Sequence, residues 1–291
     1  MLFYSFLLSQ IRVFVKKEII QTIEKAILRL EFEPDAFLSV SQELIALLPW
    51  ELPIQEFTEE ITDPVIRSKS RNLLRDFNFS KVSFHLHQIQ QNKSNSYNDL
   101  VKSLFLVATL ENEKITWKSL QLAILATENA IRSEWEKENP DDKSKILIFI
   151  KHINNAMDDF LQRIYADSKG RPLSAGIFYL LVANKLGFPL YGVNFPFHFL
   201  VFYDSPDFKT WIDPLNDGMF LNKIECDAYL KLHGFETHAD FFRKAGTISI
   251  LKRMFVNMIH FYKKANDDQL LNIMQQQLEI LIHSSSGKNN Q

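Results

Sequence analysis

Two ionisable side chains in the second half of the chain, His198 and Asp213, have the spacing of a β-hairpin pair. β-rich runs lie on both sides of a polar turn between Asp204 and Lys209. If Asp204 pairs with Lys209, Leu200 faces Asp213, and His198 becomes a diagonal neighbour of Asp213 on the same face. A slip of one residue would put His198 and Asp213 on opposite faces. Such a pair serves either as a general acid and base or as a hydrogen bond that locks the hairpin.

A strongly apolar helix is predicted over residues 173–186, with Gly187 as its stop. It starts at the stretch Gly170-Arg-Pro-Leu-Ser174. The amino end of a helix lowers the pKa of a nucleophile placed there, and a neighbouring histidine such as His198 would deprotonate it. Ser174 is the candidate nucleophile in this stretch. The alternative is a serine that caps the first turn of the helix.

The amino-acid sequence around these positions resembles that of the bacterial SirB-type transglutaminase-like proteins, whose domain also occurs in a eukaryotic F-box relative. The matching stretches are Gly-Arg-Pro-Leu-Ser, Val-Asn-Phe-Pro-Phe-His-Phe-Leu-Val and Ile-Asp-Pro-Leu-Asn-Asp-Gly. The family usually reads Gly-x-Pro-Ile-Ser, Phe-Pro-Gly-His-Phe-Leu-Val and Asp-Pro-Phe-Asn-Gly-Gly. The resemblance covers about residues 97–283. It implies a papain-like core followed by tetratricopeptide-like helices.

The resemblance also assigns positions in the site. Active transglutaminase-like proteins carry Gly-x-Cys, and a Leu-Gly ends the same helix fifteen residues after the cysteine. Counting back from Gly187 places Pro172 at the cysteine position, so the expected nucleophile is missing. His198 and Asp213 match the histidine and aspartate of the family. Ser174 lies two residues further on, about 200° around the helix, which favours the capping role.

Several residues beside the site depart from the family pattern or border the groove that it implies. Phe197 replaces the glycine before the histidine and narrows the approach to His198, and Asp217 replaces the first glycine of Asn-Gly-Gly. Gly176 in the first turn of the helix indicates close packing there. The residues expected to border a binding groove are Pro172, Asn194, Phe197 and Asn216.

Other reactive side chains are interpreted as structural. Cys226 is the only cysteine, which excludes an internal disulfide and a multi-cysteine zinc site, and its place after Asp213 is the wrong chain order for the family nucleophile. We expect it to pack in the core rather than to supply a thiolate. His85 and His87 are two apart on a predicted helix and point away from each other, so they make no ligand pair. We expect neither a metal nor another cofactor.

The eight glycines all lie from Gly170 onward, which excludes a meandering all-β domain and a glycine-rich phosphate loop from the first half. Helical spacing predicts helices over 18–31, 64–76, 79–91, 99–110, 117–138 and 144–166, and later over 222–232, 236–243, 247–265 and 267–283. A net charge of −2 argues against a general nucleic-acid binder.

The chain also has no apolar run of the ~20 residues that span a bilayer. The run from Met1 to Leu8 lacks the basic start and the cleavage site of an export signal, so we expect a cytoplasmic protein.

We therefore predict an α+β, predominantly helical chain with a helical N-terminal part, a transglutaminase- or papain-like core holding a small antiparallel sheet, and a C-terminal tetratricopeptide-like helix pair. The expected regions are 1–95, 96–245, 246–283 and a disordered tail at 284–291. The expected function is a non-catalytic module that binds a protein or peptide. The alternative is a hydrolase or acyl-transfer enzyme that uses His198 and Asp213 with Ser174 or water.

Overall fold

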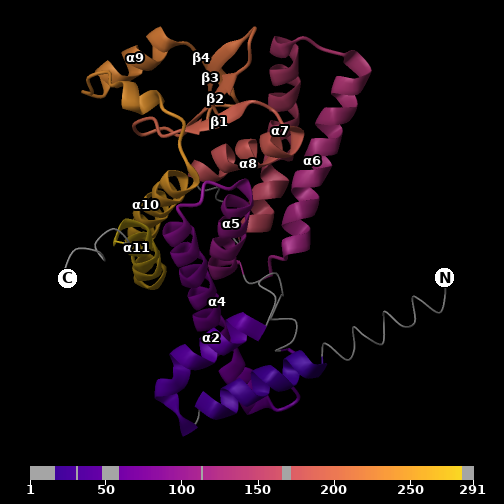
Figure 1. Ribbon diagram of the computed structural model, residues 1–291, viewed down its shortest axis with the longest axis vertical. Helices are drawn as coiled ribbons and strands as arrows, with labels where there is room; N and C mark the ends of the chain where they lie inside the picture. Colours follow the sequence, from indigo (N-terminus) through magenta and orange to yellow (C-terminus); the bar gives the residue numbers. More distant parts are fainter. Residues whose placement is uncertain (1–16, 31, 48–58, 113, 166–171, 284–291) are drawn as a thin grey trace, which may run out of the picture.

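The computed structural model describes residues 17–30, 32–47, 59–112, 114–165 and 172–283. These are mostly helical with one small antiparallel sheet, which confirms the predicted α+β fold class (Figure 1). Besides a helix over 17–30, the helices are α2 (Phe37–Leu47), α4 (Pro64–Asn92), α5 (Tyr97–Glu111), α6 (Trp117–Glu138), α7 (Asp142–Ile164), α8 (Pro172–Leu186), α9 (Lys223–Leu232), α10 (Thr247–Ala265) and α11 (Asp268–His283). The run from Met1 to Leu8, the pair Gly170-Arg171 and the tail 284–291 lie outside the described residues.

Helix α4 corrects the prediction of two separate helices at 64–76 and 79–91. Asp63 caps it by accepting hydrogen bonds from the backbone N–H groups of Val65 and Ile66 at 2.7 and 3.1 Å. The apolar pattern changes along α4 because the helix passes from one hydrophobic cluster to another. Phe77 belongs to an N-terminal cluster with the helix at 17–30 and α2, whereas Leu86 belongs to the large central core.

The C-terminal helix pair is present as α10 and α11 and packs into the central core. The Ser83 hydroxyl of α4 and the Gln277 amide of α11 are hydrogen-bonded at 2.9 to 3.1 Å, across 194 residues of chain. Helix α10 also packs against α5 and α8, and α11 packs against α4 (Figure 1). One hydrophobic cluster therefore runs from Val82 to Leu281. The predicted domain limits stay predictions.

The sheet has the strand order β1 (Leu190–Val193), β2 (Leu200–Asp204), β3 (Lys209–Asp213) and β4 (Met219–Leu221), with all neighbours antiparallel. Asp204 pairs with Lys209, which is the register predicted for the hairpin. His198 itself lies outside the hairpin strands, in a bend two residues before β2. The short strand β4 was not predicted, because three residues are too few for a visible alternation.

The two faces of the sheet meet different parts of the molecule. Val201, Tyr203 and Ile212 belong to the central core with α8. Leu200, Phe202 and Trp211, which alternate with them, belong to a smaller cluster with α9. By the same alternation, Asp213 lies on the α9 face, and so the site belongs between the sheet and α9.

The ring of Phe199, next to His198, is held between two glycines. A Cβ on Gly176 of α8 would lie 2.4 Å from Cδ1 of Phe199, and one on Gly192 of β1 would lie 2.6 Å from its Cζ. The ring therefore packs closely against the backbone at both glycines. This confirms the close packing expected at Gly176.

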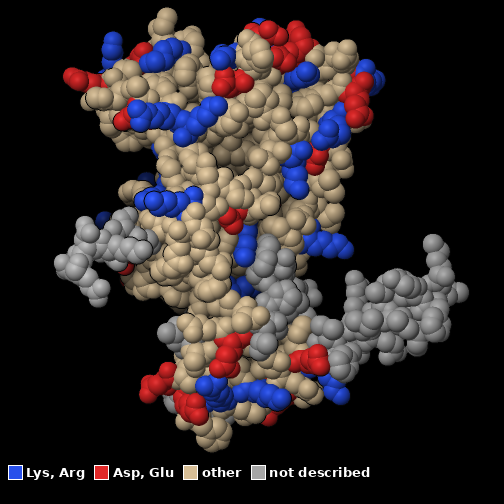
Figure 2. Space-filling view, in the orientation of Figure 1, with Lys and Arg blue, Asp and Glu red and all other residues tan. Residues whose placement is uncertain are grey.

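Charged side chains of both signs are interspersed on the face shown in Figure 2. None of the helices in the described ranges is long and apolar enough to cross a bilayer.

We predict that Gly176→Ala destabilises the protein even though alanine favours helices over glycine by about 1 kcal/mol. Overpacking against Phe199 costs about 1–3 kcal/mol and should exceed that gain, because Gly192 blocks the ring on its other end. Chemical denaturation would show a lower free energy of unfolding. Phe199→Leu in the same chain should remove most of the added cost, so additive effects of the two substitutions would contradict the packing argument.

Two histidines on α4 make a matched pair for a test of pH dependence. His85 is buried with its Nε2 atom 3.4 Å from the carbonyl oxygen of Asp99, whereas His87 is exposed. Burial, followed by the charge of Lys102, lowers the pKa of His85 to about 4. The unfolded chain therefore binds a proton at this position below about pH 6.5, and the folded chain does not do so until about pH 4.

We expect the neutral His85 to lower the free energy of unfolding by on the order of 3 kcal/mol as the pH falls from 6.5 to 4. Urea denaturation at pH 7 and pH 5 should show a smaller acid loss for His85→Leu than for the natural chain. His87→Leu should lose as much free energy of unfolding between pH 7 and pH 5 as the natural chain does. Equal pH dependence in the two variants would show that His85 is not the titrating group.

Candidate functional site

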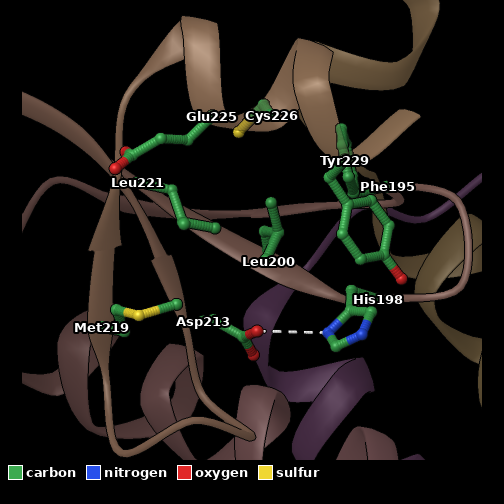
Figure 3. Close-up of a pocket in the computed structure, with 9 residues that line it drawn as sticks. All are labelled: Phe195, His198, Leu200, Asp213, Met219, Leu221, Glu225, Cys226 and Tyr229. Atoms are coloured by element: carbon green, nitrogen blue, oxygen red, sulfur yellow. Dashed lines mark ion pairs between the residues drawn. The ribbon is translucent and has the colours of Figure 1, made fainter. Parts of the chain in front are cut away.

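A pocket of about 130 Å³ lies between the sheet and α9 (Figure 3). Its polar lining comes from His198, Asp213 and Glu225, and the rest is largely apolar. The lining residues are Phe195, His198, Leu200, Asp213, Met219, Leu221, Glu225, Cys226 and Tyr229. They come from the loop before β2, from the ends of β2, β3 and β4, and from one side of α9.

The structure brings His198 and Asp213 together at one side of this pocket, as the hairpin register predicts. Nδ1 of His198 lies 3.1 Å from Oδ2 of Asp213, and the side chains are 28% and 5% exposed (Figure 3). The ring nitrogen is close enough for an ion pair when the histidine is protonated, but it is not aligned for a hydrogen bond. His198 keeps an exposed edge, so water or a ligand can reach the ring.

The carboxylate of Asp213 also holds the turn that leads into β4. Its Oδ1 accepts a hydrogen bond from the backbone N–H of Leu215 at 2.9 Å, and its Oδ2 accepts one from the side-chain amide of Asn216 at 2.7 Å. The carbonyl oxygen of Asp213 accepts a further bond from the N–H of Gly218 at 3.0 Å. Asn216, expected to border a groove, is thus part of this turn and does not line the pocket.

Ser174 lies apart from the pocket lining. It is buried, and its hydroxyl is hydrogen-bonded to the hydroxyl of Tyr165. Pro172, the residue at the expected nucleophile position, is the first residue of α8. Ser174 is the third residue of α8 and thus lies in its first turn, and its roles as a capping residue and as a nucleophile both stay predictions.

Phe197 forms the rim of the site next to His198. Its side chain is 65% exposed and contacts the rings of His233 and Phe235 at centroid distances of 5.5 and 5.4 Å. Its φ is +61°, in the left-handed region that glycine adopts with ease. Asp217 has a φ of +52°. Phe197 and Asp217, which replace glycines of the family pattern, thus both adopt the left-handed backbone conformation that glycine favours.

The loop from Asn194 to His198 is fastened to α10. The Asn194 side-chain amide donates a hydrogen bond to the Ser249 hydroxyl at 2.6 Å, and Arg253 donates one from Nη1 to the carbonyl oxygen of Phe195 at 2.7 Å. Ser249 and Arg253 are one turn apart on the same side of α10. Asn194 therefore anchors the loop rather than lining the pocket, and burial lowers the pKa of the Arg253 guanidinium.

Helix α9 supplies two lining residues that sequence reasoning did not assign to the site. The ring of Tyr229 stands edge-on to the ring of His198, with centroids 5.2 Å apart and an interplanar angle of 81°. Burial and then the charge of Asp213 raise the pKa of Tyr229. Glu225 lines the pocket while its carboxylate accepts a hydrogen bond from the N–H of Asn222 as part of a capping box. The helical spacing of Cys226, Tyr229 and Leu230 was the signal that would have indicated an inward face.

Cys226 is buried in the pocket wall, and burial raises the pKa of its thiol to about 11. The thiol is therefore protonated near neutral pH, as expected of a packing cysteine. In the described ranges, no group of three histidine, cysteine or acidic side chains is placed to hold a metal ion.

Comparison with known proteins connects this geometry to a family. Residues 151–256, which include Pro172, His198 and Asp213, match the family model of the transglutaminase-like superfamily. F-box only protein 21 of Mus musculus is 28% identical over 137 residues, which are 44% of this chain and 21% of that protein.

Bacterial relatives match stretches of similar length. A UPF0162 protein of Xylella fastidiosa is 31% identical over 115 residues, which are 38% of this chain and 41% of that protein. A UPF0162 protein of Vibrio cholerae is 25% identical over 134 residues, which are 41% of this chain and 48% of that protein. The chain spans less than half the length of these relatives, and no solved structure matches it. The chain thus contains a transglutaminase-like domain.

Proposed function

We propose that this protein is a non-catalytic member of the SirB-type transglutaminase-like proteins and that its pocket binds a segment of a protein or peptide. The observation that carries the proposal is that, among the described residues, no activated nucleophile lies beside the histidine–aspartate pair. The position of the cysteine is occupied by Pro172, and the buried Ser174 hydroxyl is bonded to Tyr165. Cys226 shares the pocket, but its thiol is protonated near neutral pH.

The lining of the pocket supports binding rather than chemistry. Most of its residues are apolar or aromatic; Asp213 and the Tyr229 hydroxyl lie beside His198, whereas the Glu225 carboxylate lies on the far side (Figure 3). Apolar cavities with a small number of oriented polar groups are typical of binding sites. Exposed apolar side chains stand near the opening, among them Phe197 and Met219. An exposed apolar patch of this kind is typical of a surface that receives a partner.

A second function, hydrolysis or acyl transfer, is favoured by one observation. His198 lies 3.1 Å from Asp213 and keeps an exposed edge, so the ring is oriented by a carboxylate and open to water. In that reaction, His198 would take a proton from water or from Ser174, and Asp213 would stabilise the resulting imidazolium.

His198→Ala tests the two functions in parallel. Asp213 keeps its bonds to Leu215 and Asn216 in this variant, so we expect circular dichroism and thermal unfolding to change little. We expect a partner captured by the natural protein to bind the variant at least roughly tenfold more weakly, because the polar side of the pocket loses its histidine. The matched control is His260→Ala, since His260 is an exposed histidine on α10.

The same preparations are to be incubated with p-nitrophenyl acetate and with a fluorogenic peptide amide. We expect no turnover that distinguishes the natural protein from His198→Ala. Turnover that His198→Ala abolishes and His260→Ala retains would establish an enzymatic function and refute the proposed non-catalytic one. Partner binding that is equal in all three proteins would refute the pocket as the binding site.

A further inference from the structure

We propose that the pocket and the adjoining edge strand β4 hold an extended peptide segment, which places one aliphatic side chain in the cavity and a lysine or arginine next to it. This inference rests on the proposed binding function and names the chemistry of the bound segment. It is carried by the cavity, by the unpaired edge of β4, by the apolar surface around the opening and by the charges beside it.

The cavity has the size of one aliphatic side chain. Its volume is about 130 Å³, and its walls near β4 come from Leu200, Met219 and Leu221. An apolar cavity of about 150 Å³ is known to take up a molecule of the size of benzene. A leucine, isoleucine or methionine side chain therefore fits this space, whereas a tryptophan does not.

Strand β4 offers a place for the backbone of such a segment. It ends the sheet, and within the described ranges no strand pairs with its outer edge. The opposite edge, β1, is partly covered, because Val193 bridges to Lys244 and Ala245 donates a hydrogen bond to the carbonyl oxygen of Gly192. An uncovered edge strand pairs readily with an extended chain. Met219 and Leu221 lie on the same face of β4 and line the cavity, so a chain added beside them would bring alternate side chains to its opening.

The surface around the opening is apolar on both sides. On the β4 side, Met219 lines the cavity and is 51% exposed. On the other side are the exposed Phe197 and, one turn beyond Tyr229 on α9, the exposed Leu232. Several exposed apolar side chains around one cavity exceed what scattered surface residues explain. They would cover the residues next to the inserted side chain.

The fixed charges that line the cavity are acidic, and two cations near its wall, Lys223 and Arg253, are held by Asp227 and by the carbonyl oxygen of Phe195. The nine lining residues include the carboxylates of Asp213 and Glu225 and contain no lysine or arginine. Asp217 is exposed immediately before Gly218 and β4, and its carboxylate forms no ion pair with the residues that the structure describes. Complementary charge sets the register of a bound chain and excludes acidic segments. The segment therefore carries a cation close to its aliphatic residue.

Selection from a phage-displayed library of random dodecapeptides against the full-length protein tests this proposal. We expect enriched peptides to share a leucine, isoleucine or methionine with a lysine or arginine within two residues. In fluorescence polarisation with a synthetic enriched peptide, alanine at the aliphatic position should weaken binding roughly tenfold or more. Two further peptides carry N-methyl groups on the odd-numbered or on the even-numbered residues. Only one of these two sets should weaken binding, because only the N–H groups along one edge of the segment pair with β4.

Three protein variants locate the peptide. Met219→Trp places a large ring over the opening from an exposed position, and it should reduce binding roughly tenfold. Asp217→Asn removes one charge while asparagine keeps the left-handed backbone, so it should weaken the basic peptide severalfold and lessen the dependence on salt. Leu122→Trp is the control, because Leu122 is 50% exposed on α6, away from the pocket; it should bind as the natural protein does.

The proposal is overturned if no peptide is enriched, if the enriched peptides share no aliphatic residue, or if Met219→Trp binds them as well as Leu122→Trp does. Those results leave the proposed binding function standing when partner capture still depends on His198. Loss of that dependence instead would refute the binding function itself.

Discussion

The pairing of β2 with β3 is the constraint on which the site depends. Because Val201, Tyr203 and Ile212 are buried in the central core, a shift of one residue would turn such side chains out of that core and toward the α9 face. The same register leaves Asp213 on the α9 face, where His198 arrives from the preceding bend. The free energy that holds the histidine and the aspartate together is therefore mainly hydrophobic and comes from the opposite face of the sheet.

Distant helices then fix the loop that carries the histidine. Phe199 is held between backbone atoms of Gly176 and Gly192, and the carbonyl of Phe195 is held by Arg253 of α10. This explains which features the sequence could predict. The hairpin register depends on local alternation, and the helix ends depend on local residues such as Asp63, so both could be predicted. The bend at His198, its hydrogen-bonded tie to Arg253 and the contact of the Tyr229 ring with His198 depend on segments 30 to 60 residues apart. The spacing along α9 could indicate that Tyr229 faces inward, but no local pattern indicates which residue it meets.

The presence of Asp213 beside His198 does not require a catalytic role. Its carboxylate accepts bonds from Leu215 and Asn216, and its carbonyl accepts one from Gly218. Removing the carboxylate would leave the N–H of Leu215 and the amide of Asn216 without these partners in the turn before β4. Gly218 adds to this constraint, since a Cβ there would lie 2.5 Å from Ile150. A pair that resembles an acid and base can therefore be held by the needs of the turn alone.

The two residues that replace glycines of the family pattern, Phe197 and Asp217, share one backbone property. Phe197 and Asp217 both have positive φ, a conformation that costs a residue with a side chain roughly 1–2 kcal/mol. Glycine would avoid that cost but would place nothing at the rim. With these residues, the site has an exposed aromatic ring beside His198 and an exposed carboxylate beside β4. Side chains that the backbone disfavours stand on both sides of the pocket, so in the proposed binding site the rim, more than the histidine–aspartate pair, would set the selectivity.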